Sequence, residues 1–548
     1  MINFISMKKA FLILILLYAS CTHAQHTVMK KWDARFGGTG ADQMAAIALT
    51  NDGGYILAGT SASSRSGDKT QSSLAGSSDY WIVKTDADGH YLWDRQYGGI
   101  DEEMLTAIYA TSDGGCIIGG TSGSDSTGDM TQRSRGGWDF WVVKIDALGN
   151  KQWDKRFGGS GGDFLYTLKQ TMDGGYILGG RSSSGISGDK TQDCRGLDDY
   201  WIVKTDGNGT KQWDKRFGSI WDEACVDILQ TPEGGYLLGG SSPATDTSGD
   251  KTQPNFGPLL RNFWVVKTDS LGTKLWDKVY GGTSGEYFGN SLNTADGSYM
   301  LSGNSFSLPS GNKTANKCGY WAVLIDTSGN KLSDWAYGSR LATGDGDCAQ
   351  SFGSMISATD GGYYLTGVSG PDISGDKTDS NLASTQIWTI RIDSQMHRVW
   401  DKTTLTTDMD ISAGVGESSQ GCYVVGVQTL AGIGGDKTQP SRGNYDYWVV
   451  EYCDTVLTSI TETAGDIRFS IYPNPTAREV SIHLEQANLK EAAFTLTNTQ
   501  GQLIYQSDET NLASSYTKIL DLGTLPSGIY LLDVTTSGQH IVRKILKE

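Results

Sequence analysis

Six acidic residues recur at one position of a sequence repeat, and they are the first candidates for chemistry. Each lies ten residues before the acid, or its equivalent, of a tight turn. The six are Asp42, Glu103, Asp163, Glu223, Glu286 and Asp410, and Gln350 stands in the remaining copy. A ring of such carboxylates could bind Ca²⁺ or a cationic ligand, because Ca²⁺ takes oxygen ligands. A ring that is solvated, or one that is paired with the loop lysines, would need no cation, since charges about 10 Å apart in water repel by only about 0.4 kcal/mol.

The segment Ser-Gly-Asp-Lys-Thr-Gln, or a near copy of it, supplies a second acid to most repeats. These acids are Asp68, Asp129, Asp189, Asp250, Asp376 and Asp436, with Asn312 in the fifth copy. An Asp that accepts backbone N–H bonds and a Gly that allows the bend are typical of a structural turn. A carbohydrate or calcium contact is the alternative. The spacing of a phosphate-binding loop is absent.

Nucleophilic catalysis lacks a base in this sequence. Of six His residues, only His90 and His397 lie inside the repeats proper, each four residues after the Asp of a tight turn. We expect both to be exposed turn residues, so no Ser/His/Asp or Cys/His site can be built from them. We therefore assign no catalytic residue and no cofactor. Trp138, Trp221 and Trp335 fall outside the repeat pattern, and they could stack on sugars or simply pack over loops.

The repeat that carries these residues predicts the fold. The first Gly of a recurrent turn falls at Gly53, Gly114, Gly174, Gly234, Gly297, Gly361 and Gly421, at spacings of 61, 60, 60, 63, 64 and 60 residues. Each copy holds four short runs rich in Tyr, Trp, Ile, Val and Phe, which favour strands. Two connections between the runs are tight and one is long. One copy is therefore a four-stranded antiparallel meander that must stack on its neighbours.

Four-stranded sheets repeated radially make a β-propeller. A Trp-Asp strand belongs to each copy, but its first example, Trp32–Gly37, precedes the first hairpin, and the last repeat ends near Cys453. We predict an all-β fold with a seven-bladed propeller over residues 27–453, in which the N-terminal strand closes the last blade. Both tight turns lie at one end of each sheet. We expect ligands at the opposite, loop-rich face.

Composition and charge suit an exported protein. The net charge of -17 argues against nucleic acid or an anionic membrane surface as a partner. Lys8 and Lys9 precede an apolar run that is too short to span a bilayer. This predicts a signal peptide over residues 1–24, cleaved after Ala24, with lipidation at Cys21 as the alternative. No later segment could cross a membrane. Seven further Cys residues leave at least one thiol unpaired within the chain, and their pairing cannot be assigned.

A second β-domain follows a polar linker. The linker covers residues 454–468 and the domain residues 469–548. Its motifs are Tyr472-Pro473-Asn474-Pro475, Leu525-Pro526-Ser527-Gly528-Ile529-Tyr530 and Arg543-Lys544-Ile545-Leu546-Lys547. They resemble the type A C-terminal sorting domain of type IX secretion in Bacteroidetes-type bacteria. The resemblance implies a small Ig-like β-sandwich that is recognised by the type IX secretion machinery and its sortase, and directs its cargo across the outer membrane. The repeats resemble, more loosely, the delta-60 repeats of bacterial secreted propellers.

These features predict an exported, non-enzymatic β-propeller that is secreted or held on the cell surface. We expect a monomer that recognises an extracellular glycan or protein through its loop-rich face. The alternative is a secreted polysaccharide-acting enzyme, a glycosidase or lyase, that uses carboxylates of that face. The sequence does not identify the ligand.

Overall fold

The chain is built almost entirely from β-strands. A computed structural model describes residues 25–258, 260–338, 348, 350–370, 373, 375–418, 422–457, 467–486, 489–498, 502–536 and 539–547. Over these residues the one regular element that is not a strand is a short 3-10 turn, Leu74–Gly76. No helix in the described part of the chain is long and apolar enough to cross a membrane. The chain divides into two compact units, His26–Val456 and Leu457–Glu548.

Seven four-stranded sheets make up the larger unit. Six of them follow one another along the chain with their strands in simple order: the first holds β2 (Asp42–Leu49), β3 (Tyr55–Ser61), β4 (Asp79–Thr85) and β5 (Tyr91–Tyr97), and the second β6 (Glu103–Ala110), β7 (Cys116–Ser122), β8 (Asp139–Ile145) and β9 (Lys151–Phe157). The third holds β10 (Asp163–Gln170), β11 (Tyr176–Ser182), β12 (Asp199–Thr205) and β13 (Lys211–Phe217), and the fourth β14 (Ala224–Gln230), β15 (Tyr236–Ser242), β16 (Asn262–Thr268) and β17 (Lys274–Tyr280). The fifth holds β18 (Glu286–Asn293), β19 (Tyr299–Ser305), β20 (Gly319–Ile325) and β21 (Lys331–Tyr337), and the sixth β22 (Gln350–Ser357), β23 (Tyr363–Ser369), β24 (Gln386–Ile392) and β25 (Arg398–Thr404). The seventh sheet joins β26 (Asp410–Glu417), β27 (Cys422–Thr429), β28 (Asp446–Leu457) and β1 (Gln25–Phe36).

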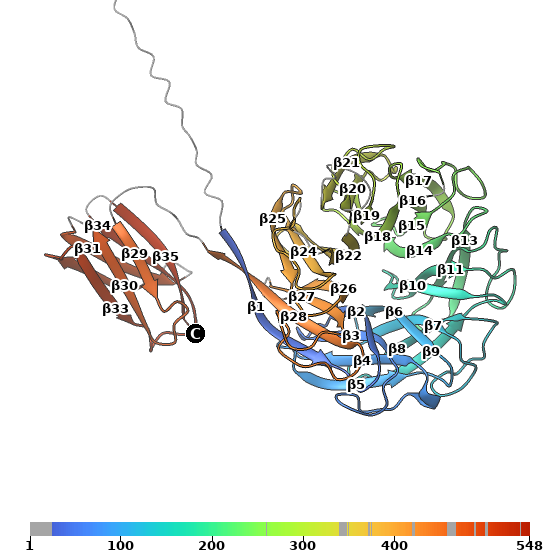
Figure 1. The fold of residues 1–548 in the computed structure, drawn as a ribbon, viewed down its shortest axis with the longest axis horizontal. Coiled ribbons are helices and arrows are strands. Elements are labelled where there is room, and N and C mark those ends of the chain that lie inside the picture. The colour runs from blue at the N-terminus through green and yellow to red at the C-terminus, as the bar shows by residue number, and fades with distance from the viewer. Residues whose placement is uncertain are drawn as a thin grey trace, which may run out of the picture. The chain divides into compact units, whose positions relative to one another are not determined.

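The seven sheets lie around a common centre (Figure 1). The first strand of each sheet lies innermost and contacts the first strand of the next sheet. The contacts return to their start, because β26 of the seventh sheet contacts β2. This radial arrangement of four-stranded sheets is that of a β-propeller.

Aromatic residues on the third strands hold neighbouring sheets together. The ring centroids of Phe140 on β8 and Trp201 on β12 are 4.8 Å apart, as are those of Tyr200 on β12 and Trp264 on β16. The Tyr200 hydroxyl also donates to the Trp264 carbonyl oxygen at 2.9 Å. Gly180 on β11 leaves the space that this packing needs, since a Cβ there would come within 2.9 Å of the Phe140 ring. The recurrent Gly and Tyr-Trp positions are thus explained by contacts between sheets.

Strand β1 completes the seventh sheet beside β28. Asp33 of β1 accepts hydrogen bonds from Trp448 Nε1 at 3.1 Å and from the Thr438 backbone N–H at 2.9 Å. Trp32 packs on Tyr55 of the first sheet with ring centroids 5.8 Å apart. The start and the end of the repeat region therefore share one sheet, the arrangement that the order of the Trp-Asp motifs predicts.

Two disulfide bonds lie in the larger unit, Cys318–Cys348 and Cys422–Cys453. The second joins facing residues of β27 and β28. Cys116, Cys194 and Cys225 are free thiols. The sequence predicted an unpaired thiol but could not assign these pairs.

The smaller unit has two sheets. One contains β29 (Ile467–Tyr472), β30 (Glu479–Gln486) and β33 (Ser515–Asp521), and the other has the order β32 (Leu503–Thr510), β31 (Glu491–Asn498), β34 (Gly528–Thr536), β35 (Gln539–Lys547). Alternate residues of both sheets, such as Ile482, Phe494 and Leu532, are fully buried in one apolar core. The core explains the strict alternation of apolar and polar residues in these strands.

Candidate ligand groove and buried carboxylates

The six recurrent acids lie at or beside the start of the innermost strand of their sheets, and all six are buried. Asp163 shows the pattern: its Oδ2 atom accepts from the Gly159 backbone N–H at 2.7 Å and from Ser184 Oγ at 2.9 Å. The loop lysine Lys190 is also buried, and its Nζ donates to Ser182 Oγ at 2.9 Å. Burial within the sheets rules out a solvated ring. Serines and backbone N–H groups enclose most of the acids, and Thr406 Oγ1 donates to Asp410 Oδ2 at 2.8 Å.

These acids do not form a multi-ligand metal centre. In the part of the chain that the structure describes, no three His, Cys, Asp or Glu side chains gather where they could hold a metal ion. Buried loop lysines reach the acids through serines instead: Lys69 Nζ donates to Ser61 Oγ at 2.7 Å, and the Ser61 hydroxyl donates to Asp42. A positive charge is thus already supplied by the protein.

The Ser-Gly-Asp-Lys-Thr-Gln loop ties its own sheet to the preceding one. The Asp189 backbone N–H donates to the Gly158 carbonyl oxygen at 2.7 Å. The Thr191 backbone N–H donates to Asp214 Oδ2 at 3.0 Å, and that oxygen also accepts from Trp201 Nε1 at 3.2 Å. The recurrence of the loop, of the Trp-Asp pair and of the Tyr-Trp pair has one cause, because the loop backbone and the Trp201 indole both donate to the Asp214 carboxylate. This supports the structural-turn interpretation of the loop.

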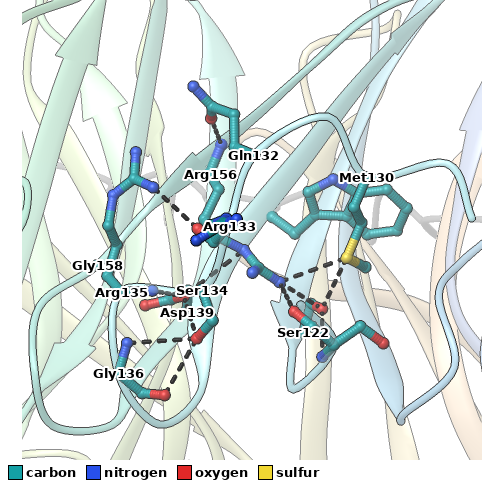
Figure 2. A network of polar contacts seen from close by, with 12 residues as sticks. Ser122, Met130, Gln132, Arg133, Ser134, Arg135, Gly136, Asp139, Arg156 and Gly158 are labelled. Carbon is teal, nitrogen blue, oxygen red and sulfur yellow. Dashed lines mark hydrogen bonds and ion pairs between the residues drawn. The ribbon is translucent and has the colours of Figure 1, made fainter. Parts of the chain in front are cut away.

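One repeat departs from the loop sequence and compensates for the change. Met130 takes the place of the loop lysine in the second sheet, and Arg156 supplies the buried cation (Figure 2). The Arg156 Nη2 atom donates to Ser122 Oγ at 2.9 Å, as Lys190 does to Ser182 in the next sheet. A buried cation at this position is therefore part of the fold.

The Trp-Asp acids should be among the most sensitive positions for stability. Asp214→Ala removes the acceptor of two buried donors, the indole N–H of Trp201 and the backbone N–H of Thr191. It also breaks the ion pair in which the Asp214 carboxylate lies 3.0 Å from Lys211 Nζ. We expect the free energy of unfolding to fall by about 3–5 kcal/mol in chemical denaturation. The control is Asp206→Ala in an exposed turn, where about 1 kcal/mol should be lost. Equal losses would contradict the assignment.

A cavity of about 230 Å³ opens among the third, fourth and fifth sheets. Arg181 Nη1 bonds to Asp198 Oδ2 at 3.0 Å, and Arg261 forms an ion pair with Asp222. Arg261 also donates to the Ser241 carbonyl oxygen at 3.1 Å. All of these residues stand at the strand ends that face the long connections, so the cavity belongs to the loop-rich face.

An aromatic wall extends this cavity toward the sixth sheet. Tyr287, which is 49% exposed, lies with Phe288 in the lining of both the first cavity and a second one of about 340 Å³. The Tyr287 and Phe306 ring centroids are 6.0 Å apart. Asn304 in the second cavity is 5% exposed, and its Oδ1 atom has no hydrogen-bond donor among the described residues. We call the two adjoining cavities the loop-face groove.

Of the residues that line the loop-face groove, Glu223 was among the acids that the sequence pointed to, but sequence reasoning missed Arg181, Arg261 and the aromatic wall. The signal was a departure from the repeat: Arg181 occupies a position where other repeats carry Thr60 and Thr121. Trp138 lies elsewhere on the loop-rich face, 6.2 Å from Phe164 between ring centroids. His90 and His397 are exposed, with 77% and 72% of their side chains accessible. Chain-wide regularity pointed to the acids, of which Glu223 lines the groove, whereas Arg181 and Arg261 stand at irregular positions.

The motifs of the C-terminal unit meet in space. Asn474 donates from Nδ2 to the Lys544 carbonyl oxygen at 2.7 Å and accepts the Leu546 backbone N–H at 2.8 Å. The Tyr530 hydroxyl donates to the Pro526 carbonyl oxygen at 2.9 Å. Lys547 is buried, whereas the side chains of Tyr472, Pro473, Pro475 and Lys544 are exposed. The Tyr-Pro-Asn-Pro segment is thus fixed to the last strand, β35.

The chain therefore combines a propeller-type repeat unit with a small two-sheet unit whose sequence motifs interlock. Residues 470–548 match the family of the secretion system C-terminal sorting domain. This match supports the resemblance to a type IX sorting tail, which implies export to the cell surface or the medium. The match covers the C-terminal unit and not the repeats.

Other similarities cover parts of the chain. Regulatory protein FlaEY of Caulobacter vibrioides is 27% identical over 202 residues, which are 35% of this chain and 20% of FlaEY. Hydrazine synthase of Kuenenia stuttgartiensis has a TM-score of 0.38 at 12% identity, covering 72% of this chain and 94% of that one. The Pan2 WD40 domain of Neurospora crassa has a TM-score of 0.32 at 10% identity, covering 62% and 91%. Likeness at these scores carries no argument about function.

Proposed function

We propose that the protein is an exported, non-enzymatic recognition module. A signal peptide over residues 1–24 takes it across the inner membrane, and the Ig-like sorting domain over residues 469–548 takes it through the type IX machinery. Residues 27–453 form a closed seven-bladed propeller, followed by a linker over residues 454–468. The sorting-family match supports the export steps, and the ring of contacts between sheets supports closure.

The loop-face groove is the observation that carries the recognition role. We infer that it binds an uncharged stretch of an extracellular glycan. Arg181 and Arg261 are each matched by an aspartate, and the chain has a net charge of -17, so no surplus positive charge awaits an anionic ligand. The paired groups still offer N–H donors and carboxylate oxygens to hydroxyl groups. The Tyr287 and Phe306 rings offer flat apolar faces of the kind that line small-molecule sites.

A glycan array followed by calorimetric titration tests this proposal. Neutral oligosaccharides should bind the purified protein, and Tyr287→Ala or Arg181→Ala should weaken binding about tenfold or more. His397→Ala, an exposed change at the tight-turn end, is the matched control and should bind normally. Equal binding by all variants would remove the groove from the proposal.

Catalysis on a polysaccharide is the competing function, and its best sequence candidate is enclosed. Glu286 is buried and accepts from Asn262 Nδ2 at 2.5 Å, from Ser305 Oγ at 2.9 Å and from the Gly282 backbone N–H at 3.0 Å. A carboxylate held in this way does not face the groove. Release of shortened chains from a bound polysaccharide, lost in Glu286→Gln, would overturn the non-enzymatic proposal.

A further inference from the structure

Carboxyl groups from neighbouring sheets meet at several of the seven interfaces. Asp139 on β8 interacts with Asp163 on β10, Asp199 on β12 with Glu223 beside β14, and Asp446 on β28 with Asp42 on β2. All six residues are buried. Two ionised carboxylates so close together in a dry place would repel strongly.

The interface between the fourth and fifth sheets has an amide where these three have an acid. Asn262 stands at the position of Asp139, Asp199 and Asp446 in the repeat. Its Nδ2 atom donates to Glu286 Oε2 at 2.5 Å and lies 3.2 Å from the carbonyl oxygens of Arg261 and Gly282. The side-chain atom at this point is therefore surrounded by acceptors and must be a donor.

The Oδ1 atoms of Asp139, Asp199 and Asp446 face the same place. One glycine of the repeat serves as a common reference point for this place. A Cβ on Gly281 would meet Asn262 Nδ2 at 2.5 Å. At the equivalent glycines, a Cβ on Gly158 would meet Asp139 Oδ1 at 1.8 Å, and a Cβ on Gly218 would meet Asp199 Oδ1 at 1.9 Å. The Oδ1 atoms of all three acids are buried and have no donor among the described residues. An ionised oxygen can only accept, so it would be left unsatisfied there.

We propose that Asp139, Asp199 and Asp446 each carry a proton on Oδ1 in the folded protein, and that these three protons form a pH-sensitive latch between neighbouring sheets. Each protonated acid then acts as Asn262 does and donates to acceptors of the next sheet. The latch holds in mildly acidic medium. It weakens as the pH rises and the second carboxyl of each pair ionises.

The charges around the pairs are compatible with this state. Arg156 Nε and Arg216 Nε lie 3.5 Å from the Oδ2 atoms of Asp139 and Asp199, so these cations face the other oxygen. The remaining charged or titratable neighbours are Lys190 beside Asp163 and Asp199, Cys194 beside Asp199, Lys251 beside Glu223, Arg35 and Lys437 beside Asp446, and Lys69 beside Asp42. Burial is the largest influence, and it raises the pKa of Asp139 to about 6 and raises the pKa of Asp199 and of Asp446.

The sign of the pH effect follows from these raised pKa values. An acid whose pKa is raised by folding contributes its full stabilisation of the folded state at pH values below its ordinary pKa of 3.8. This contribution is lost as the pH rises through the pKa of the acid in the folded protein. Burial lowers the pKa of Lys69 and of Lys251 to about 8, which affects stability above pH 8 and not below it. Between pH 5 and pH 7.5 the pairs titrate together with Glu103 and Asp410, whose pKa values burial raises to about 7, so the contribution of the three pairs is the difference between the parent protein and a variant that lacks them.

Calorimetric melting of the purified protein at pH 5 and pH 7.5 tests the latch. The melting temperature should fall by about 5 °C between these values. In the triple variant Asp139→Asn, Asp199→Asn, Asp446→Asn the fall should be smaller than in the parent protein, because Glu103 and Asp410 still titrate in this interval, and Asn262→Asp should enlarge the fall. The infrared band of protonated carboxyl groups should be present at pH 5 in the parent protein and reduced in the triple variant.

Three results would overturn the proposal. An unchanged pH dependence in the triple variant would place the titrating groups elsewhere. The same protonated-carboxyl band at pH 5 in the parent protein and in the triple variant would show that the pairs are already ionised there. A melting temperature that rises with CaCl₂ and falls with EDTA at pH 7.5 would put a divalent cation where we place the protons. If the triple variant does not fold, Asn262→Asp still decides the question.

Discussion

Deletion of residues 30–38 is expected to lower the melting temperature of the repeat unit by more than about 10 °C. The deleted segment holds most of β1, which is the fourth strand of the seventh sheet. Trp448 Nε1 and the Thr438 N–H would lose their acceptor, Asp33, and Tyr55 would lose its contact with Trp32. Strand β28 would become an exposed edge, which invites association with other chains.

Scanning calorimetry of the purified protein measures this effect. A point variant distinguishes the loss of the Asp33 hydrogen bonds from the loss of the whole strand. Asp33→Ala keeps β1 but removes the acceptor of Trp448 and Thr438, so it should lower the melting temperature by a smaller amount. Asp86→Ala, in an exposed turn of the first sheet, is the control for the loss of a carboxylate. An unchanged melt after the deletion would mean that β1 does not hold the ring together.

Much of the architecture could be read from the sequence because the repeat is enforced by contacts that recur. Trp201 and Thr191 both donate to Asp214, so the three motifs must appear together in most copies. The first Trp-Asp pair, Trp32-Asp33, lies at the start of the repeat region, whereas its partner, Tyr447-Trp448, lies at the end of that region. A count of motifs alone therefore predicted that the first strand returns to the last sheet.

The state of the recurrent acids could not be predicted in the same way. A carboxylate at the start of a strand could face solvent or the next sheet. The sequence pattern of Asp163 and its equivalents is the same in both cases, so it does not show which orientation is adopted. The distinction depends on Ser184 and the Gly159 N–H, which enclose the carboxylate only after two connections have folded over it. The exchange of Met130 and Arg156 for a lysine also needs coordinates, since the two residues are far apart in the sequence.

The groove illustrates the opposite problem, because its arginines carry no repeat signal, although the recurrent acid Glu223 lies beside them. Arg181 and Arg261 come from two sheets, and each reads in the sequence as an ordinary polar residue at a strand end. The structure brings them to one cavity with Asp198 and Asp222. Positions that break a repeat, compared with equivalent positions in the other copies, are the sequence feature by which such a site could be found.

Replacement of Asn474 by Leu is expected to prevent release of the protein to the cell surface or the medium. Asn474 holds the Tyr-Pro-Asn-Pro segment on β35 through two hydrogen bonds, to the Lys544 carbonyl oxygen and from the Leu546 N–H. Leu cannot make either bond, and their loss costs about 1–3 kcal/mol. The Tyr-Pro-Asn-Pro segment would then no longer be held beside β35, so the sorting machinery would not meet the two together. In a Bacteroidetes host with active type IX secretion, immunoblots of cell and medium fractions should show the variant retained inside the cell.

Two controls show whether recognition or folding is lost. Arg478→Ala changes an exposed ion pair with Asp521 in the same unit and should leave export unchanged. Asn474→Asp keeps the acceptor for the Leu546 N–H but loses the donor to Lys544, so its export should be intermediate. Calorimetry should show the same melting transition of the repeat unit in all three variants, because none of these residues belongs to it. Normal export of Asn474→Leu would mean that the sorting machinery reads the last strand without the Tyr-Pro-Asn-Pro segment fixed beside it.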